Sequence, residues 1–239
     1  MILYNKTIFF RLSVQKVVFL QLHNHLHKMK KDLLYQLGDT PFDLSVLSGL
    51  FPNTKHITDK ARRLEQEGRI IRLKRGIYVR SAEDGAHPVQ ELIANHLYGP
   101  SYVSMQSALR HYGLIPERVF SIQSTTIKHS RSFNTPLGHY DFLSCPIAYF
   151  PIGIQQQQEG NSQFLIASPE KALCDLLVKT RGLEFDSSSN LHDYLENDLR
   201  FDCTALRSFN SSIFLQCLKH TTTKRNNIST LINLVEHGQ

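Results

Sequence analysis

The sequence predicts an α+β fold with two parts, a small N-terminal unit and a larger mixed α/β part that ends in helices. Up to Gln66 the apolar residues recur at helical spacing, and two short β-prone runs then flank Gly76. From residue 88 helix and strand patterns alternate, and the final 50 residues read as mostly helical. A chain of 239 residues with 41% hydrophobic content can bury the cores of one large or two modest domains.

The N-terminal unit is predicted to begin with two helices. The first runs to about Leu37 and ends at Gly38, since glycine favours the left-handed conformation that follows a helix. Thr40 and Pro41 then read as an N-cap and a first-turn proline. They open a short helix that Pro52 ends, with an apolar face of Leu44, Leu47 and Leu50.

A third helix and a hairpin follow. Asn53 or Thr54 is the predicted N-cap of this helix, and the spacing places Ile57, Ala61 and Leu64 on one buried face. Gly68 ends the helix. Residues 69–73 and 77–79 are β-prone and flank a turn of Lys74, Arg75 and Gly76, which predicts a hairpin.

Residues 53–80 contain nine Lys and Arg against three Asp and Glu, so their net charge of +6 equals that of the whole chain. Three helices followed by a basic hairpin is the order of a winged helix-turn-helix, which inserts its third helix into the major groove of DNA. A salt-bridged surface helix is the simpler alternative. The predicted base-reading residues are Lys55, Thr58, Asp59, Arg62 and Gln66. The predicted phosphate contacts are Lys60, Arg63, Arg72, Lys74 and Arg75. Arg69 and Arg80, at the strand ends, are expected to be solvated.

Residues 81–87 change abruptly to acidic and small side chains, which is typical of a linker. We therefore expect a DNA-binding domain over residues 1–82, with an N-terminal helical extension, and a second domain over residues 83–239. In the second domain the patterns predict helices at 89–98 and 104–112 and strands at 102–103, 119–127, 139–144 and 164–167. Residues 130–138 are expected to form a turn and residues 151–162 an exposed loop.

Ser168, Pro169 and Glu170 repeat the pattern of an N-cap, a first-turn proline and an early acidic residue, and predict a helix through Leu177. Within it, Lys171 and Asp175 are spaced i, i+4, as in an ion pair on a helix surface worth a few tenths of a kcal/mol. Ser104 similarly reads as the N-cap of its own helix.

Three segments of the second domain, SYVSMQSALRHYGLIPE at 101–117, TPLGHYDF at 135–142 and IASPEKALCDLL at 166–177, follow the basic unit in order. Together they resemble the AbiEi-type antitoxins of abortive-infection, type IV toxin-antitoxin systems, over roughly residues 30–180. The long N-terminal extension departs from the family pattern. The resemblance implies that the winged helix represses its own operon by binding inverted repeats in promoter DNA. It also implies that the second domain counters a nucleotidyltransferase toxin without a stable complex, with Ser168, Glu170, Lys171 and Asp175 in its signature helix.

The sequence predicts no catalytic residues, cofactor or metal site. Walker, GxGxxG, HExxH and GxSxG motifs are absent, and the four cysteines lack zinc-ligand spacing. His23, His25 and His27 alternate, which suits a strand but not the helix expected there. Arg11 and Lys16 interrupt the apolar N-terminal runs, so we expect neither a signal peptide nor a membrane span. A cytoplasmic protein with reduced thiols is the resulting expectation.

Two other functions fit the same sequence. A winged-helix transcription factor could carry a ligand-binding or dimerisation domain in place of an antitoxin domain. A nucleic-acid enzyme could use Asp141, Glu170 and Lys171 as a carboxylate and lysine cluster, provided that folding brings these residues together.

Overall fold

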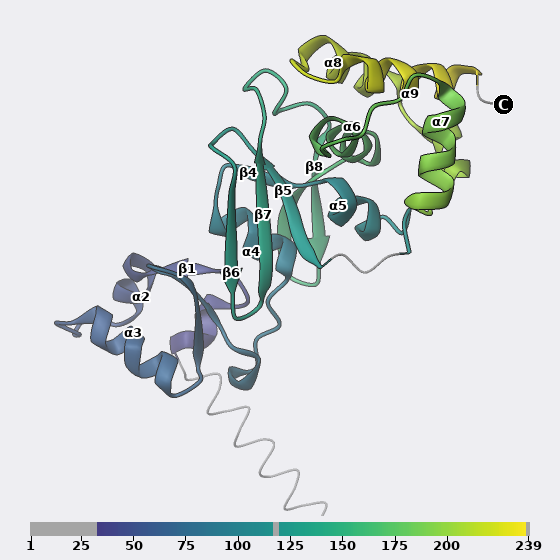
Figure 1. Ribbon diagram of the computed structural model, residues 1–239. Coiled ribbons are helices and arrows are strands. Elements are labelled where there is room, and N and C mark those ends of the chain that lie inside the picture. Colours follow the sequence, from purple (N-terminus) through teal and green to yellow (C-terminus); the bar gives the residue numbers. More distant parts are fainter. Residues whose placement is uncertain (1–32, 117–119, 238–239) are drawn as a thin grey trace, which may run out of the picture.

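The computed structural model describes residues 33–116 and 120–237 and has an α+β fold with two separate sheets (Figure 1). A three-stranded sheet belongs to the N-terminal part, and a six-stranded sheet forms the centre of the rest. Among the described residues, no helix combines the length and the apolar character needed to cross a membrane. The expected helix before residue 33 and the three alternating histidines lie outside the described residues.

The N-terminal part has helices on one antiparallel sheet of order β1-β3-β2. Its core takes buried side chains from every element: Leu34, Phe42, Leu47, Ala61, Leu64, Ile70 and Tyr78. The elements are η1 Leu33–Leu37, β1 Phe42–Asp43, α2 Leu44–Leu50, α3 Ile57–Gln66, β2 Ile70–Lys74 and β3 Ile77–Arg80. The buried face predicted for α3 is confirmed, because Ala61 and Leu64 are fully buried and Ile57 packs against the same cluster.

Both helix starts in this part differ from the prediction. Asp43, not Thr40, is the N-cap of α2, and its carboxylate accepts hydrogen bonds from the backbone N–H groups of Ser45 and Val46. Phe42 lies in a strand because it pairs with Tyr78 of β3 and stacks on that ring. Neither Asn53 nor Thr54 caps α3. That helix begins after His56, which makes no side-chain cap.

Asp84 joins the predicted linker to the N-terminal sheet. Residues Ala82–Asp84 form the short 3-10 helix η2, and its Asp84 carboxylate contacts Arg69 and Arg80, each at 2.9 Å. Arg80 is only 3% exposed, and its guanidinium also donates to the Asp84 carbonyl at 2.6 Å and lies over the Tyr35 ring. The expectation that Arg69 and Arg80 are solvated was therefore wrong. The carboxylate that both arginines contact comes from the segment read as a linker.

Replacing Asp84 with alanine is expected to lower the free energy of unfolding by about 3 kcal/mol, because it leaves the buried Arg80 without its carboxylate. Chemical denaturation measures this loss. The neighbouring Glu83→Ala is the control, since Glu83 is exposed and should change stability by less than about 0.5 kcal/mol. Equal effects of the two substitutions would contradict the assigned role of Asp84.

The six-stranded sheet has the order β6-β7-β5-β4-β9-β8 and mixes parallel and antiparallel pairs. Helices α4 Gln90–Leu97 and α5 Met105–His111 pack against it. Two strands were missed in the sequence, since β6 occupies the predicted turn and β8 the predicted loop. The strands are β4 Ser101–Val103, β5 Ser121–Thr126, β6 Arg131–Thr135, β7 Gly138–Ser144, β8 Ile154–Glu159 and β9 Ser162–Ala167.

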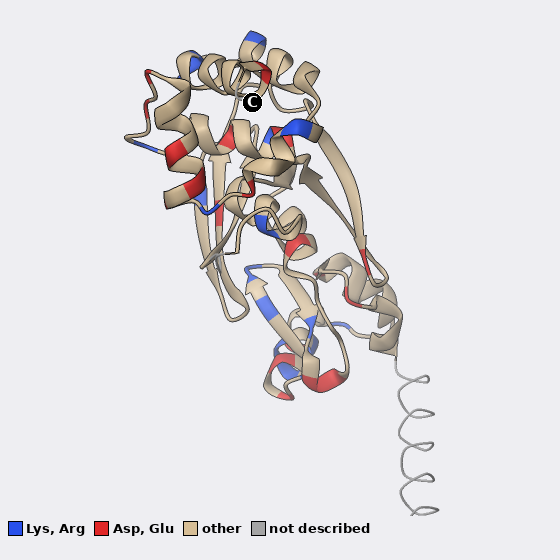
Figure 2. Cartoon of the chain, turned by 90° about the vertical axis from the view of Figure 1, so that its right-hand side faces the viewer, with Lys and Arg blue, Asp and Glu red and all other residues tan. Residues whose placement is uncertain are grey.

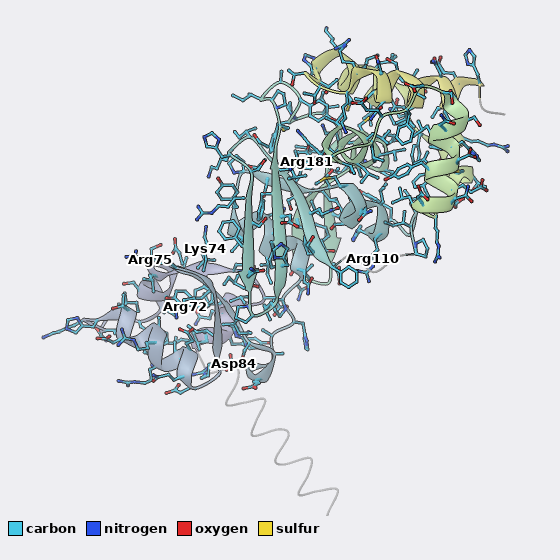
Figure 3. All side chains as sticks on the ribbon, viewed as in Figure 1. Arg72, Lys74, Arg75, Asp84, Arg110 and Arg181 are labelled. Carbon is cyan, nitrogen blue, oxygen red and sulfur yellow. The ribbon has the colours of Figure 1, made fainter. Side chains whose placement is uncertain are left out.

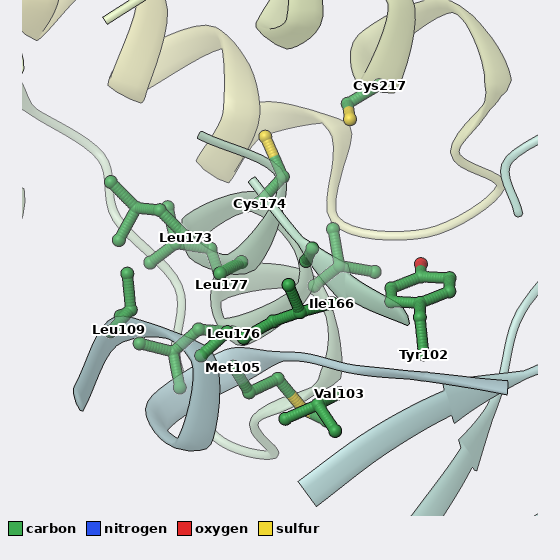
Figure 4. Packing of buried hydrophobic residues seen from close by; sticks show 14 of the residues in the cluster. Tyr102, Val103, Met105, Leu109, Ile166, Leu173, Cys174, Leu176, Leu177 and Cys217 are labelled. Carbon is green, nitrogen blue, oxygen red and sulfur yellow. The ribbon is translucent and has the colours of Figure 1, made fainter. Parts of the chain in front are cut away.

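The helical C-terminal region is confirmed and packs around α6. Leu109, Leu173 and Leu177 lie together in the main apolar cluster, which joins α5 to α6 beside the sheet (Figure 4). Helices α8 and α9 both contact α6, so the tail extends the core of the second part. The elements are α6 Pro169–Lys179, α7 Ser188–Asp193, η3 Tyr194–Asp198, η4 Cys203–Ser208, α8 Ser211–His220 and α9 Arg225–His237.

All four cysteines are free thiols, and three of them are buried. Burial raises the pKa of the Cys145 thiol to about 11, from an ordinary value of 9.0. We expect iodoacetamide at mildly alkaline pH to alkylate the partly exposed Cys203 first, although burial also raises the pKa of that thiol. The shift alone makes the Cys145 thiolate about a hundredfold scarcer than at an ordinary cysteine. Mass spectrometry of native and unfolded protein measures the order, and labelling of Cys145 before Cys203 would contradict it.

Candidate nucleic-acid interface

Helix α3 presents a polar face opposite its buried one. Thr58, Asp59, Arg62, Arg63 and Gln66 are all exposed, whereas Ala61 and Leu64 face the core. Arg62 lies 3.7 Å from Asp59, and both side chains are more than 60% exposed. Such an exposed pair is weak, so the guanidinium remains available to another partner.

The two lysines assigned to this region have different surroundings. Lys55 is exposed but lies in the turn before α3, because the helix starts two or three residues later than expected. Lys60 is half-buried, with its ammonium 4.7 Å from the centre of the Phe51 ring. It therefore lies on the side of α3 that meets the turn from α2.

The β2–β3 hairpin carries the second group of basic residues, and the Lys and Arg positions of the N-terminal part are coloured in Figure 2. Arg72 lies 3.4 Å from Glu65 of α3, an exposed ion pair that connects the helix to the hairpin. Arg75 is exposed at the turn, next to Gly76, whose φ of +81° suits the left-handed region that glycine tolerates. Arg75 is therefore the exposed cation at the hairpin tip.

Lys74 points toward the second part of the molecule (Figure 3). Its ammonium donates to the Leu97 carbonyl at 2.5 Å and lies 5.3 Å from the centre of the Phe133 ring. Burial lowers the pKa of Lys74, and the nearby charges of Arg131 and Lys128 lower it further. The predicted phosphate contact is thus already bound within the protein.

Lys74, Lys128 and Arg131 form what we call the junction cluster, between the hairpin and the six-stranded sheet. The Lys128 ammonium lies over the Tyr98 ring and donates to the Gly99 carbonyl, and the Arg131 guanidinium lies over the Phe133 ring. None of the three forms a salt bridge with a described carboxylate. Lys128 and Arg131 were missed because the sequence KHSR at 128–131 lies far along the chain from the basic segment.

The four residues singled out in the sequence at α6 are all buried: Ser168, Glu170, Lys171 and Asp175. Ser168 caps the helix as predicted, since its hydroxyl accepts from the Lys171 backbone N–H. The Glu170 carboxylate accepts from the backbone N–H of Asn210, the residue before α8. These contacts fix the start of α6 and anchor the helix that follows.

Lys171 and Asp175 form a fully buried ion pair with their charged atoms 3.2 Å apart, so the prediction of a surface pair was wrong. The Lys171 ammonium also donates to the Tyr149 carbonyl. The other carboxylate oxygen of Asp175 accepts three hydroxyl hydrogen bonds. They come from Tyr102 at 3.0 Å, Ser104 at 2.7 Å and Thr125 at 3.1 Å. Burial raises the pKa of Tyr102, and the Asp175 charge raises it further, so this tyrosine remains a hydrogen-bond donor.

Ser104 precedes α5 but makes no side-chain cap there, because its hydroxyl is committed to Asp175. The network therefore connects α6 to β4 and β5, and it holds the signature residues inside the fold.

The described contacts do not connect Asp141 with Lys171, although both were suggested as members of one carboxylate and lysine cluster. Asp141 on β7 accepts from Ser132 at 2.5 Å and lies 3.0 Å from the His139 ring, whereas Lys171 contacts Asp175 and Tyr149. Partial burial opposes ionisation of Asp141, but hydrogen bonds from Ser132 and Ser121 and the nearby His139 together lower its pKa. Across residues 33–116 and 120–237, no group of three His, Cys, Asp or Glu side chains is placed to hold a metal ion.

A groove of about 920 Å³ lies between the segment after η2 and the first residues of β5 and β7. Its lining includes side chains of both charge signs, among them Glu91, Glu159 and Arg110. This groove is a candidate pocket for a small polar ligand.

No protein-family model matches this chain, and no curated protein matches it either.

Proposed function

We propose that residues 33–80 form a winged helix-turn-helix that binds double-stranded DNA. The observation that carries this proposal is the exposed polar face of α3, which lies opposite a buried apolar face and contacts the hairpin through Glu65 and Arg72. A helix of this kind fits the major groove, where side chains meet base edges. Arg62 is suited to a guanine edge, and Gln66 to an adenine edge.

The phosphate contacts in this proposal come from residues on either side of the reading face. Lys60 and Arg63 flank it on α3, and Arg72 and Arg75 extend it along the hairpin. Lys128 and Arg131 of the junction cluster continue the positive surface onto the second part. Such contacts give affinity and register but do not distinguish sequences.

A gel-shift titration against the DNA upstream of its own reading frame tests the DNA-binding proposal. We expect tighter binding to that duplex than to a random duplex of equal length and salt. Arg207→Ala is the matched control for arginine variants of the proposed surface. Arg207 is an exposed arginine of the C-terminal region and lies outside that surface. Equal affinity for both duplexes would contradict the proposal that the protein is a promoter-specific repressor.

We further propose that the whole chain is a non-enzymatic antitoxin that represses its own operon and counters a nucleotidyltransferase toxin. The order of the three segments at 101–117, 135–142 and 166–177 supports this proposal. The first and third segments supply Ser104, Lys171 and Asp175 to one buried network, so in this proposal the signature shapes the domain and other, exposed residues oppose the toxin. Co-expression with a nucleotidyltransferase from the adjacent reading frame should restore growth.

A transcription factor that responds to a small ligand is the second candidate, and the groove beside Arg110 favours it. In that case co-expression would leave the toxicity of the neighbouring protein unchanged, while a polar metabolite would alter DNA affinity. Metal-dependent nuclease turnover that is lost on replacement of Asp141 would instead support an enzyme.

A further inference from the structure

Strand β8 is the last strand of the six-stranded sheet, and its outer edge has no neighbouring strand in the described chain. The Ser168 N–H donates to the Gly153 carbonyl at 2.7 Å, in register with the pairing of Ile154 and Ala167. Antiparallel pairs alternate between hydrogen-bonded and non-hydrogen-bonded positions. The N–H and C=O groups of Ile154, Gln156 and Gln158 therefore point away from β9, toward the free edge.

Asn95 supports this orientation independently. Leu165, the partner of Gln156 on β9, donates its N–H to the Asn95 side chain at 2.6 Å and accepts from it at 3.2 Å. Leu165 thus directs its backbone away from β8, as a non-hydrogen-bonded position must. No hydrogen bond from the described residues reaches the outward backbone groups of Ile154, Gln156 or Gln158.

The two edges of this sheet are protected differently. Edge strand β6 carries Arg131 and is partly covered by the N-terminal hairpin, whose Lys74 lies over Phe133. Edge strands are usually protected by charges, proline, bulges or covering elements. Strand β8 reads IQQQQE, without lysine, arginine or proline, and its register with β9 runs from Ile154 to Glu159 without a bulge.

We propose that β8 pairs antiparallel with β8 of a second copy of this chain, which joins the two six-stranded sheets into one. With the twofold axis at Gln156, Ile154 faces Gln158 of the second copy. About six backbone hydrogen bonds then form from the outward groups. Glu159 falls opposite Gly153, so the register brings no like charges together. The neutral glutamine run is self-complementary in this register, which favours a second copy over an unrelated strand.

Sedimentation without DNA tests the pairing independently of the proposed DNA binding. We expect a concentration-dependent dimer for the full chain and its loss in Gln156→Pro. Proline removes an outward N–H and no β8–β9 hydrogen bond, a position that an edge strand tolerates. Thermal unfolding should confirm that the variant is folded, and Gln156→Ala, which keeps the N–H, should remain a dimer. A wild-type monomer at the highest soluble concentration, or a dimer that survives in folded Gln156→Pro, overturns the proposal.

Cysteine cross-linking tests the register. In the proposed pairing residue 156 faces its own copy at about 5.5 Å between Cα atoms, within the range of a disulfide. Residue 155 lies about 7–8 Å diagonally from its copy, outside that range. Under mild oxidation Gln156→Cys should give a covalent dimer and Gln155→Cys should not, with the wild-type chain reporting any reaction of Cys203. Equal cross-linking at both positions overturns the register, and cross-linking at neither overturns the pairing.

Discussion

Replacing Asp175 with alanine is expected to lower the free energy of unfolding by about 3–5 kcal/mol, the largest stability effect predicted for this chain. The substitution leaves the Lys171 ammonium charged and fully buried without its carboxylate. It also removes the acceptor shared by the hydroxyls of Tyr102, Ser104 and Thr125. Buried donors without an acceptor add to the loss. Chemical denaturation followed by circular dichroism measures it.

Two controls separate the buried charge from the position on the helix. The pair His192 and Glu196 has the same i, i+4 spacing but is exposed, so Glu196→Gln should cost less than about 0.5 kcal/mol. The double variant Lys171→Met with Asp175→Asn removes both charges and keeps a carbonyl acceptor for the hydroxyls. It should recover most of the stability lost in Asp175→Ala. If the double variant were as unstable as the single one, the unpaired charge would not be the cause.

The elements with strong local signals were predicted from the sequence. Gly38 has the positive φ expected after a helix, and Ser168 caps α6. Strands β6 and β8 were missed because their sequences, RSFNT and IQQQQE, lack the apolar alternation of a half-buried strand. Both are edge strands and owe their conformation to pairing with β7 and β9, an interaction between residues that a local pattern does not contain.

The candidate interface was predictable where exposure follows from helix periodicity. Ile57, Ala61 and Leu64 fix the buried face of α3, so the exposure of Thr58, Arg62 and Gln66 follows. The surroundings of Lys74 were not predictable, because its partners Leu97 and Phe133 lie 23 and 59 positions further along the chain. Likewise the spacing of Lys171 and Asp175 indicated an ion pair, but its burial depends on residues up to 73 positions away.

Replacing Arg62 with alanine is expected to reduce the preference for the specific duplex by about 1–3 kcal/mol, since an arginine that reads a guanine edge contributes that much discrimination. Affinity for random duplex should change much less. Fluorescence anisotropy with both duplexes at one salt concentration measures the difference. An equal loss on both duplexes would place Arg62 among the phosphate contacts.

Arg75→Ala and Lys74→Met should differ in the salt dependence of DNA binding, although the residues are adjacent at the hairpin tip. Arg75 is exposed, so its loss should weaken binding to every duplex and reduce the slope of log affinity against log salt by about 1. The Lys74 ammonium is bound to the Leu97 carbonyl, so its replacement should leave that slope unchanged and lower thermal stability instead. A reduced slope for Lys74→Met would mean that the lysine leaves Leu97 when DNA binds. The hairpin would still be joined to the second part, because Leu73 and Val79 are buried in the main apolar cluster.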